Sequence, residues 1–83
     1  MADDTKTFNV TTWEKTLLLR KRLNWTRAEL VAFLNKKRVL PIAIKEKAYS
    51  SWENGTARAP KEAEERIDDV ITMELYRTQK NKT

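Results

Sequence analysis

The chain has no cysteine and no histidine, and only one glycine and two prolines in 83 residues. The usual zinc sites and the thiol or imidazole groups of many catalytic centres are therefore excluded. A single glycine cannot build a glycine-rich phosphate loop. The acids between positions 62 and 69 are better explained by the positive end of a helix than by a metal site. We expect no enzyme, no metal, no cofactor and no small-molecule ligand.

Long hydrophobic runs are also missing. The longest apolar stretches, 17–19 and 39–44, are far too short to cross a bilayer. The start, Met1–Asp4, is acidic and lacks the basic residues and apolar stretch of a secretion signal. The absence of cysteine gives no indication of an oxidising compartment. We expect a cytoplasmic protein that has no membrane partner.

Positive charge and helix-forming residues are abundant. Lys and Arg number 17 against 12 Asp and Glu, so the formal net charge is +5, which attracts polyanions such as nucleic acid. Few helix breakers favour an all-α fold. At this length we predict one small domain at 11–78, preceded by a flexible arm at 1–10 and followed by a frayed tail at 79–83.

Two capping patterns mark the first two helices. Thr11-Thr12-Trp13-Glu14 and Thr26-Arg27-Ala28-Glu29 both match the capping box, in which a threonine hydroxyl and a glutamate three positions on satisfy each other's backbone amides. We predict a first helix over about 12–23, which Asn24 ends in a left-handed conformation. The second helix begins at the second box, with Asn35 as the next candidate left-handed stop.

The segment 36–44 is ambiguous, because its apolar run suits a buried loop, a short strand or a helix start. Since proline is tolerated in the first turn, we place the third helix start at Pro41 or as late as Lys45, and its end at Asn54 before Gly55. Pro60 opens a last helix over about 61–77. The expected fold is all-α, a single helix-turn-helix bundle of about four helices.

Two stretches of the chain resemble one family. Residues 19–30, Leu-Arg-Lys-Arg-Leu-Asn-Trp-Thr-Arg-Ala-Glu-Leu, resemble the start of the Cro/XRE (lambda-repressor-like) helix-turn-helix family. Residues 51–55, Ser-Trp-Glu-Asn-Gly, followed by Pro60, resemble the end of its recognition helix. The resemblance covers about residues 17–71. The chain departs from the family in an atypically long segment between the second and third helices, where the family has a tight turn.

The resemblance implies residue roles. Arg20 would pair with Glu53 of the recognition helix, and the start of the second helix would contact a phosphate. The implied phosphate contacts are Thr26, Arg27 and Arg58, and the inserted basic run Lys36, Lys37 and Arg38 either adds to them or is an ordinary solvated surface. The implied base contacts, on the exposed face of the recognition helix, are Lys45, Glu46, Lys47, Ser50 and Ser51.

The function implied is sequence-specific binding of double-stranded DNA by a small transcriptional regulator of the phage or mobile-element repressor type. Such proteins usually bind pseudo-palindromic sites as homodimers. Met73, Leu75 and Tyr76 could form a dimer seam or simply belong to the core. The alternative is a protein-interaction module on the same fold, such as an antitoxin or a phage-encoded inhibitor of a host protein. Glu46 in the reading face and the altered turn favour that alternative.

Overall fold

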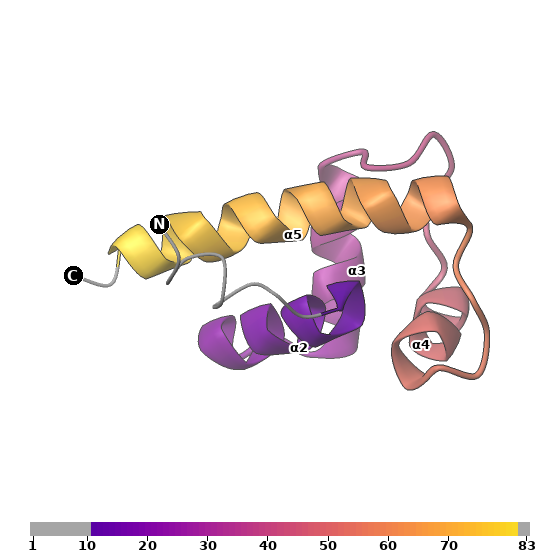
Figure 1. Cartoon of the computed structure of the whole chain (residues 1–83), viewed down its shortest axis with the longest axis horizontal. Helices are drawn as coiled ribbons and strands as arrows, with labels where there is room; N and C mark the ends of the chain where they lie inside the picture. The colour runs from indigo at the N-terminus through magenta and orange to yellow at the C-terminus, as the bar shows by residue number, and fades with distance from the viewer. Residues whose placement is uncertain (1–10, 82–83) are drawn as a thin grey trace.

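A computed structural model describes residues 11–81, so the predicted arm at 1–10 and the end of the predicted tail lie outside the described residues. Within this range four helices follow one another (Figure 1), and they are α2 (Thr12–Leu23), α3 (Arg27–Lys36), α4 (Glu46–Asn54) and α5 (Lys61–Asn81). Residues 11–81 contain no strand. The prediction of an all-α fold with four helices is confirmed. No helix in this range combines the length and the apolar character needed to cross a membrane.

The first two helices begin at the predicted capping boxes. The Thr11 hydroxyl accepts from the Glu14 amide at 3.2 Å, and the Thr11 amide donates to Glu14 Oε1 at 2.9 Å. At the start of α3, Thr26 and Glu29 exchange the same two hydrogen bonds at 3.1 and 2.7 Å. Both predicted starts are confirmed, because each box closes within four residues and needs no distant contact.

Left-handed residues follow three of the helices. Asn24 (φ 59°) follows α2 and Gly55 (φ 84°) follows α4, as the sequence predicts. The prediction for α3 is wrong, since Asn35 stays inside the helix and Arg38 takes the positive φ of 54°. The reason is a tertiary contact of the Asn35 side chain. Its Oδ1 accepts a hydrogen bond from the backbone amide of Ile44 at 2.7 Å, and its Nδ2 donates to the backbone carbonyl of Ile44 at 3.1 Å.

That bidentate clamp shapes the segment between α3 and α4. Ile44 and Val39 are buried in the core, whereas Pro41 and Ile42 are exposed. With both backbone groups of Ile44 bonded to a side chain, the segment cannot close a helical ladder through that residue. A helix start at Pro41 is therefore wrong: residues 37–45 form an irregular loop and α4 begins at Glu46.

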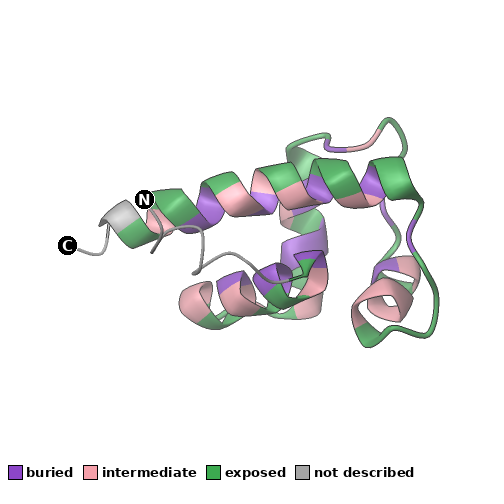
Figure 2. Cartoon of the chain, in the orientation of Figure 1, coloured by how far each residue is buried: buried purple, intermediate pink, exposed green. Residues whose placement is uncertain are grey.

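α5 lies alongside α2, and α3 runs across the direction of both (Figure 1). Buried side chains from every helix and from the α3–α4 loop meet between them, and these are Leu19, Leu30, Val31, Leu34, Val39, Ile44, Tyr49, Ile67, Ile71 and Leu75. Figure 2 shows these buried positions on the inward sides of the helices. Leu75 thus belongs to the core and cannot contribute to a dimer seam.

Polar contacts lock α5 onto α2. Lys15, with 10% of its side chain exposed, pairs with Asp68 at 3.0 Å and donates to Thr72 Oγ1 at 3.1 Å. Arg22 Nη1 donates to the Leu75 carbonyl at 3.0 Å and to Thr78 Oγ1 at 3.2 Å. These contacts hold the C-terminal half of α5, which continues through Asn81 beyond its predicted end near residue 77.

Candidate nucleic-acid interface

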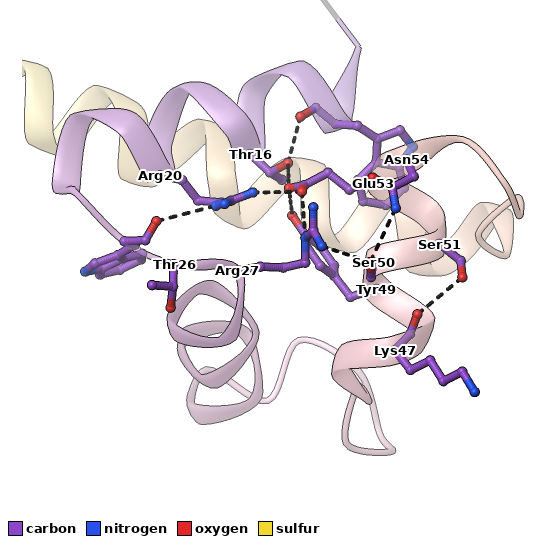
Figure 3. Close-up of polar contacts among 12 residues, drawn as sticks. Thr16, Arg20, Thr26, Arg27, Lys47, Tyr49, Ser50, Ser51, Glu53 and Asn54 are labelled. Carbon is purple, nitrogen blue, oxygen red and sulfur yellow. Dashed lines mark hydrogen bonds and ion pairs between the residues drawn. The ribbon is translucent and has the colours of Figure 1, made fainter.

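Glu53 is the centre of a polar cluster that joins α2, α3 and α4 (Figure 3). Its Oε1 accepts from Arg20 Nη1 at 2.7 Å and from Arg27 Nε at 3.0 Å. Its Oε2 accepts from the Tyr49 hydroxyl at 2.9 Å and from Thr16 Oγ1 at 3.4 Å. The pair of Arg20 with Glu53 that the resemblance implies is therefore present, with 7% of the Glu53 side chain exposed.

The surroundings of Glu53 keep it ionised. Burial alone would raise the pKa of Glu53, but hydrogen bonds from Tyr49 and Arg27 and the positive charge of Arg20 outweigh it and hold the pKa below its ordinary value. Burial likewise raises the pKa of the Tyr49 hydroxyl, so this group stays a hydrogen-bond donor to Glu53. A charge-assisted cluster of this kind fixes the C-terminal half of α4 against the start of α3.

Aromatic packing secures the same end of α4. The Tyr49 side chain is fully buried, and its ring lies 6.0 Å from that of Trp13 in an edge-to-face arrangement. The Trp52 ring also lies 6.0 Å from that of Trp13. Both tryptophans are partly buried against the core, so they support α4.

The outward face of α4 carries polar side chains. Lys47 is exposed and, in Figure 3, points away from the Glu53 cluster. Lys45 and Glu46 are also exposed at the start of the helix, where Lys45 is the N-cap and Glu46 lies in the first turn. An acid in the first turn is favoured by the helix dipole, which gives Glu46 a structural role.

The two serines of α4 differ in their bonding. The Ser50 hydroxyl accepts from Arg27 Nη1 at 2.9 Å and from Asn54 Nδ2 at 3.4 Å. With both acceptor positions used, Ser50 can act toward a ligand only as a donor. The Ser51 hydroxyl instead donates to the Lys47 carbonyl at 3.3 Å, so its proton is used within the helix.

Asn54 is absent from the predicted base contacts, although it is a further candidate on the same helix face. This exposed residue lies four positions after Ser50 and seven after Lys47, which is the spacing of one helix face. Asparagine can pair with adenine in two hydrogen bonds. The spacing of Asn54 from Lys47 and Ser50 is the sequence signal that points to this residue.

Three of the implied phosphate contacts lie at the start of α3 and in the loop between α4 and α5. Thr26 is the exposed N-cap of α3, and Arg27 beside it is partly buried, with 33% of its side chain exposed. Within residues 11–81 the Arg27 Nη2 has no hydrogen-bond partner, although Nε and Nη1 are both bonded. Arg58 is exposed in the loop between α4 and α5.

The basic run after α3 lies elsewhere. Lys36, Lys37 and Arg38 are all exposed at the end of α3 opposite Thr26. A ten-residue helix is about 15 Å long, so the run is well separated from the α3 start. The Lys37 ammonium lies 5.7 Å from the Phe33 ring and borders a hollow beside α5. The structure brings together Arg20, Arg27, Ser50 and Glu53, and it leaves this run outside that group.

No family model, curated protein or solved structure matches this chain. The resemblance to the Cro/XRE family therefore rests on the two sequence motifs quoted above. Among residues 11–81 no three acidic side chains gather in a way that could hold a metal ion.

An apolar groove lies on the other side of α4. Its volume is about 430 Å³, and its walls come from the α3–α4 loop, α4 and the start of α5. Ile42 in this loop is 77% exposed, the highest exposure of any large hydrophobic side chain among the described residues. Leu40, Ala48 and Trp52 line the same groove.

Proposed function

We propose that this protein binds double-stranded DNA sequence-specifically, with α4 in the major groove, and acts as a small transcriptional regulator of the phage or mobile-element repressor type. The observation that carries the proposal is the Glu53 cluster. Its hydrogen bonds hold the start of α3 in a fixed position relative to the second half of α4. In the proposal the start of α3 binds phosphate and α4 reads bases, so this cluster fixes the geometry between the two contacts.

The dimensions and chemistry of α4 suit this role. An α-helix with its side chains is about 10–12 Å across, so the major groove, about 12 Å wide, admits α4. Lys47 is a donor for guanine O6 and N7, and Ser50 can donate to the same kind of acceptor. Asn54 adds the bidentate option for adenine, whereas Ser51 contributes less because its proton is used.

Arg27 would contact the DNA backbone in this proposal. Its Nε and Nη1 are held by Glu53 and Ser50, which leaves the two N–H groups of Nη2 for a phosphate oxygen. An arginine held in this way loses little rotamer freedom on binding, and the exposed start of α3 supplies further backbone donors. Lys45 and Arg58 would add charge on either side of α4.

A protein-binding module is the second candidate, and the apolar groove beside α4 favours it. Exposed Ile42 and the groove residues Leu40 and Trp52 give a surface that an apolar helix of a partner protein could cover. DNA binding would not need this groove, so the two candidates predict different effects of the same substitutions.

Selection from a random duplex pool, followed by gel shift on the selected site and on a scrambled duplex, tests the proposal. Lys47→Gln should reduce preference at one base pair by about 1–3 kcal/mol. The matched control is Lys37→Gln, which removes the same charge at the far end of α3 and should leave that preference unchanged. Failure to select any sequence, with the chain folded, would reject DNA reading in favour of the second candidate.

A further inference from the structure

The apolar groove beside α4 has the size of a small-molecule site. Figure 1 shows α4 and the start of α5 at the same end of the molecule, and the groove lies between them and the α3–α4 loop. Its volume of about 430 Å³ falls in the range of about 300–1,000 Å³ that such sites occupy. Leu40, Ala48 and Trp52 in its walls are half-buried, and Ile42 is 77% exposed. An apolar ligand would remove the surface of these four side chains from water.

One uncompensated positive charge borders this groove. The charged residues that line it are Lys45, Glu62 and Arg66. Glu62 and Arg66 neutralise each other, since Arg66 Nη2 lies 2.8 Å from Glu62 Oε2. Lys45 forms no ion pair with the residues that the structure describes, and Glu46 next to it does not line the groove. An anionic group beside Lys45 would therefore gain a charge partner.

The start of α4 adds to the positive character of this end of the groove. Lys45 is the N-cap of α4, and its side chain forms no capping hydrogen bond, in contrast to Thr11 and Thr26. The first N–H groups of a helix carry a partial positive charge and have no partner within the helix. Ala48, the third residue of α4, lines the groove together with Lys45.

The groove offers little to any other polar group of a ligand. Among the described residues no serine, threonine, asparagine, glutamine or tyrosine lines it, so the indole of Trp52 is the one uncharged polar side chain in its walls. A ligand with several polar groups would lose hydration without gaining hydrogen bonds. The chemistry of the walls thus selects a molecule that is apolar along its length and anionic at one end.

We propose that the apolar groove binds a small amphipathic carboxylate, a medium-chain fatty acid. The alkyl chain lies against Leu40, Ile42 and Trp52, and the carboxylate lies beside Lys45. This ligand goes beyond the proposed function and replaces the expectation of no small-molecule ligand, because the groove forms only in the folded chain. Binding requires no DNA.

A single alkyl chain matches the extent of this apolar surface better than a partner helix does. A helix that docks in a groove uses several apolar anchors spaced three or four residues apart, and each needs a place on the receiving surface. The other exposed large hydrophobic residues of the described chain, Leu17, Met73 and Tyr76, line no part of this groove. The apolar surface around Ile42 is therefore confined to one small hollow.

Isothermal titration of the full chain without DNA tests the inference, with hexanoate, octanoate and decanoate as probes below their micellar concentrations. Affinity should rise by up to about fourfold for each added methylene, the factor that full burial of a CH₂ group gives. Ile42→Ser should weaken decanoate binding about fivefold, because the most exposed apolar contact is lost. The matched control is Met73→Ser, which removes a 72% exposed side chain outside the groove and should leave the affinity unchanged.

The charge preference is tested with decylammonium. Wild type should bind decanoate about threefold or more tightly than decylammonium, since one exposed ion pair contributes up to about fivefold in affinity. Lys45→Gln should remove most of this preference. Lys47→Gln is the matched control, because Lys47 carries the same charge two positions later but does not line the groove, and this variant should keep the preference.

Three results would overturn the inference. They are no saturable binding of decanoate, equal effects of Ile42→Ser and Met73→Ser, and equal effects of Lys45→Gln and Lys47→Gln. Circular dichroism of each variant, with and without decanoate, checks that the helices remain formed. An acidic amphipathic peptide that binds wild type but not Ile42→Ser, while decanoate does not bind, would assign the groove to a partner helix. Decanoate binding by a chain that selects no duplex would reject the proposed function and keep this site.

Discussion

Removing the Glu53 carboxylate is the most informative perturbation of this fold. Glu53→Ala leaves Arg20 and Arg27, with 19% and 33% of their side chains exposed, without their shared acceptor. It also removes the acceptor of the Tyr49 hydroxyl, which is attached to a fully buried ring. Breaking a buried pair costs about 3–5 kcal/mol, and partial hydration of both arginines places this case at the lower end, about 3 kcal/mol.

The expected loss is large for a domain of this size. At about 0.05–0.15 kcal/mol per residue, the whole domain is stable by roughly 4–12 kcal/mol. A loss of about 3 kcal/mol lowers the Tm by roughly 12–24 °C. Urea unfolding at low temperature, followed by tryptophan fluorescence and circular dichroism, measures the free energy of unfolding for wild type, Glu53→Ala, Arg20→Ala and the double variant.

The double-mutant cycle separates the ion pair from the rest of the cluster. We expect a coupling free energy of about 1–2 kcal/mol between Arg20 and Glu53. Glu53→Gln serves as the matched variant, since it keeps the shape and one carbonyl acceptor and should lose about half as much stability as Glu53→Ala. Additive losses in the cycle, or a Glu53→Ala loss below about 1 kcal/mol, would refute the reasoning.

Three further predictions concern pH, salt and the basic run. The pKa of Glu53 is lower in the folded state than its ordinary value of 4.5. The carboxylate therefore stabilises the fold fully above pH 4.5, and this stabilisation is lost as the pH falls through the pKa of the folded state. The difference in free energy of unfolding between wild type and Glu53→Gln should therefore shrink from pH 7 to pH 3 in urea titrations, and a constant difference would contradict this. For a selected duplex, the log of the binding constant should fall with log salt at a slope of roughly −4 to −7, for about four to eight neutralised phosphates per dimer, and a flat dependence would argue against duplex binding. Replacing residues 36–38 together by glutamine should leave this slope nearly unchanged, because Lys37 borders α5. A slope smaller in magnitude by about five, for the six charges removed per dimer, would place the run on the DNA.

The limits of sequence reasoning are visible at the α3–α4 segment. The apolar stretch 39–44 could not be assigned from its pattern, and the predicted helix start at Pro41 is wrong. What decides the path is the clamp between Asn35 and Ile44, nine residues apart, together with burial of Val39. Asn35 was expected to end a helix because asparagine tolerates a left-handed backbone. Instead its side chain forms hydrogen bonds with both backbone groups of Ile44.

The candidate site shows the same division. The pair of Arg20 with Glu53 was implied by the motif resemblance, because both positions belong to recognisable motifs. The second arginine on Glu53 was not foreseen, and Arg27 was expected only as a phosphate contact. Whether a side chain faces a ligand or its own protein depends on neighbours that are distant in the sequence.

What the sequence by itself determined is the set of helices and most of their ends. The capping boxes at Thr11 and Thr26, and the left-handed residues Asn24 and Gly55, act through hydrogen bonds that close within a few positions. Only the tertiary structure decided where the remaining side chains point. Thr16 is buried next to an exposed Leu17, and Leu75 lies in the core next to an exposed Tyr76. The reason is that the packing of one helix against another determines which face of each helix is buried.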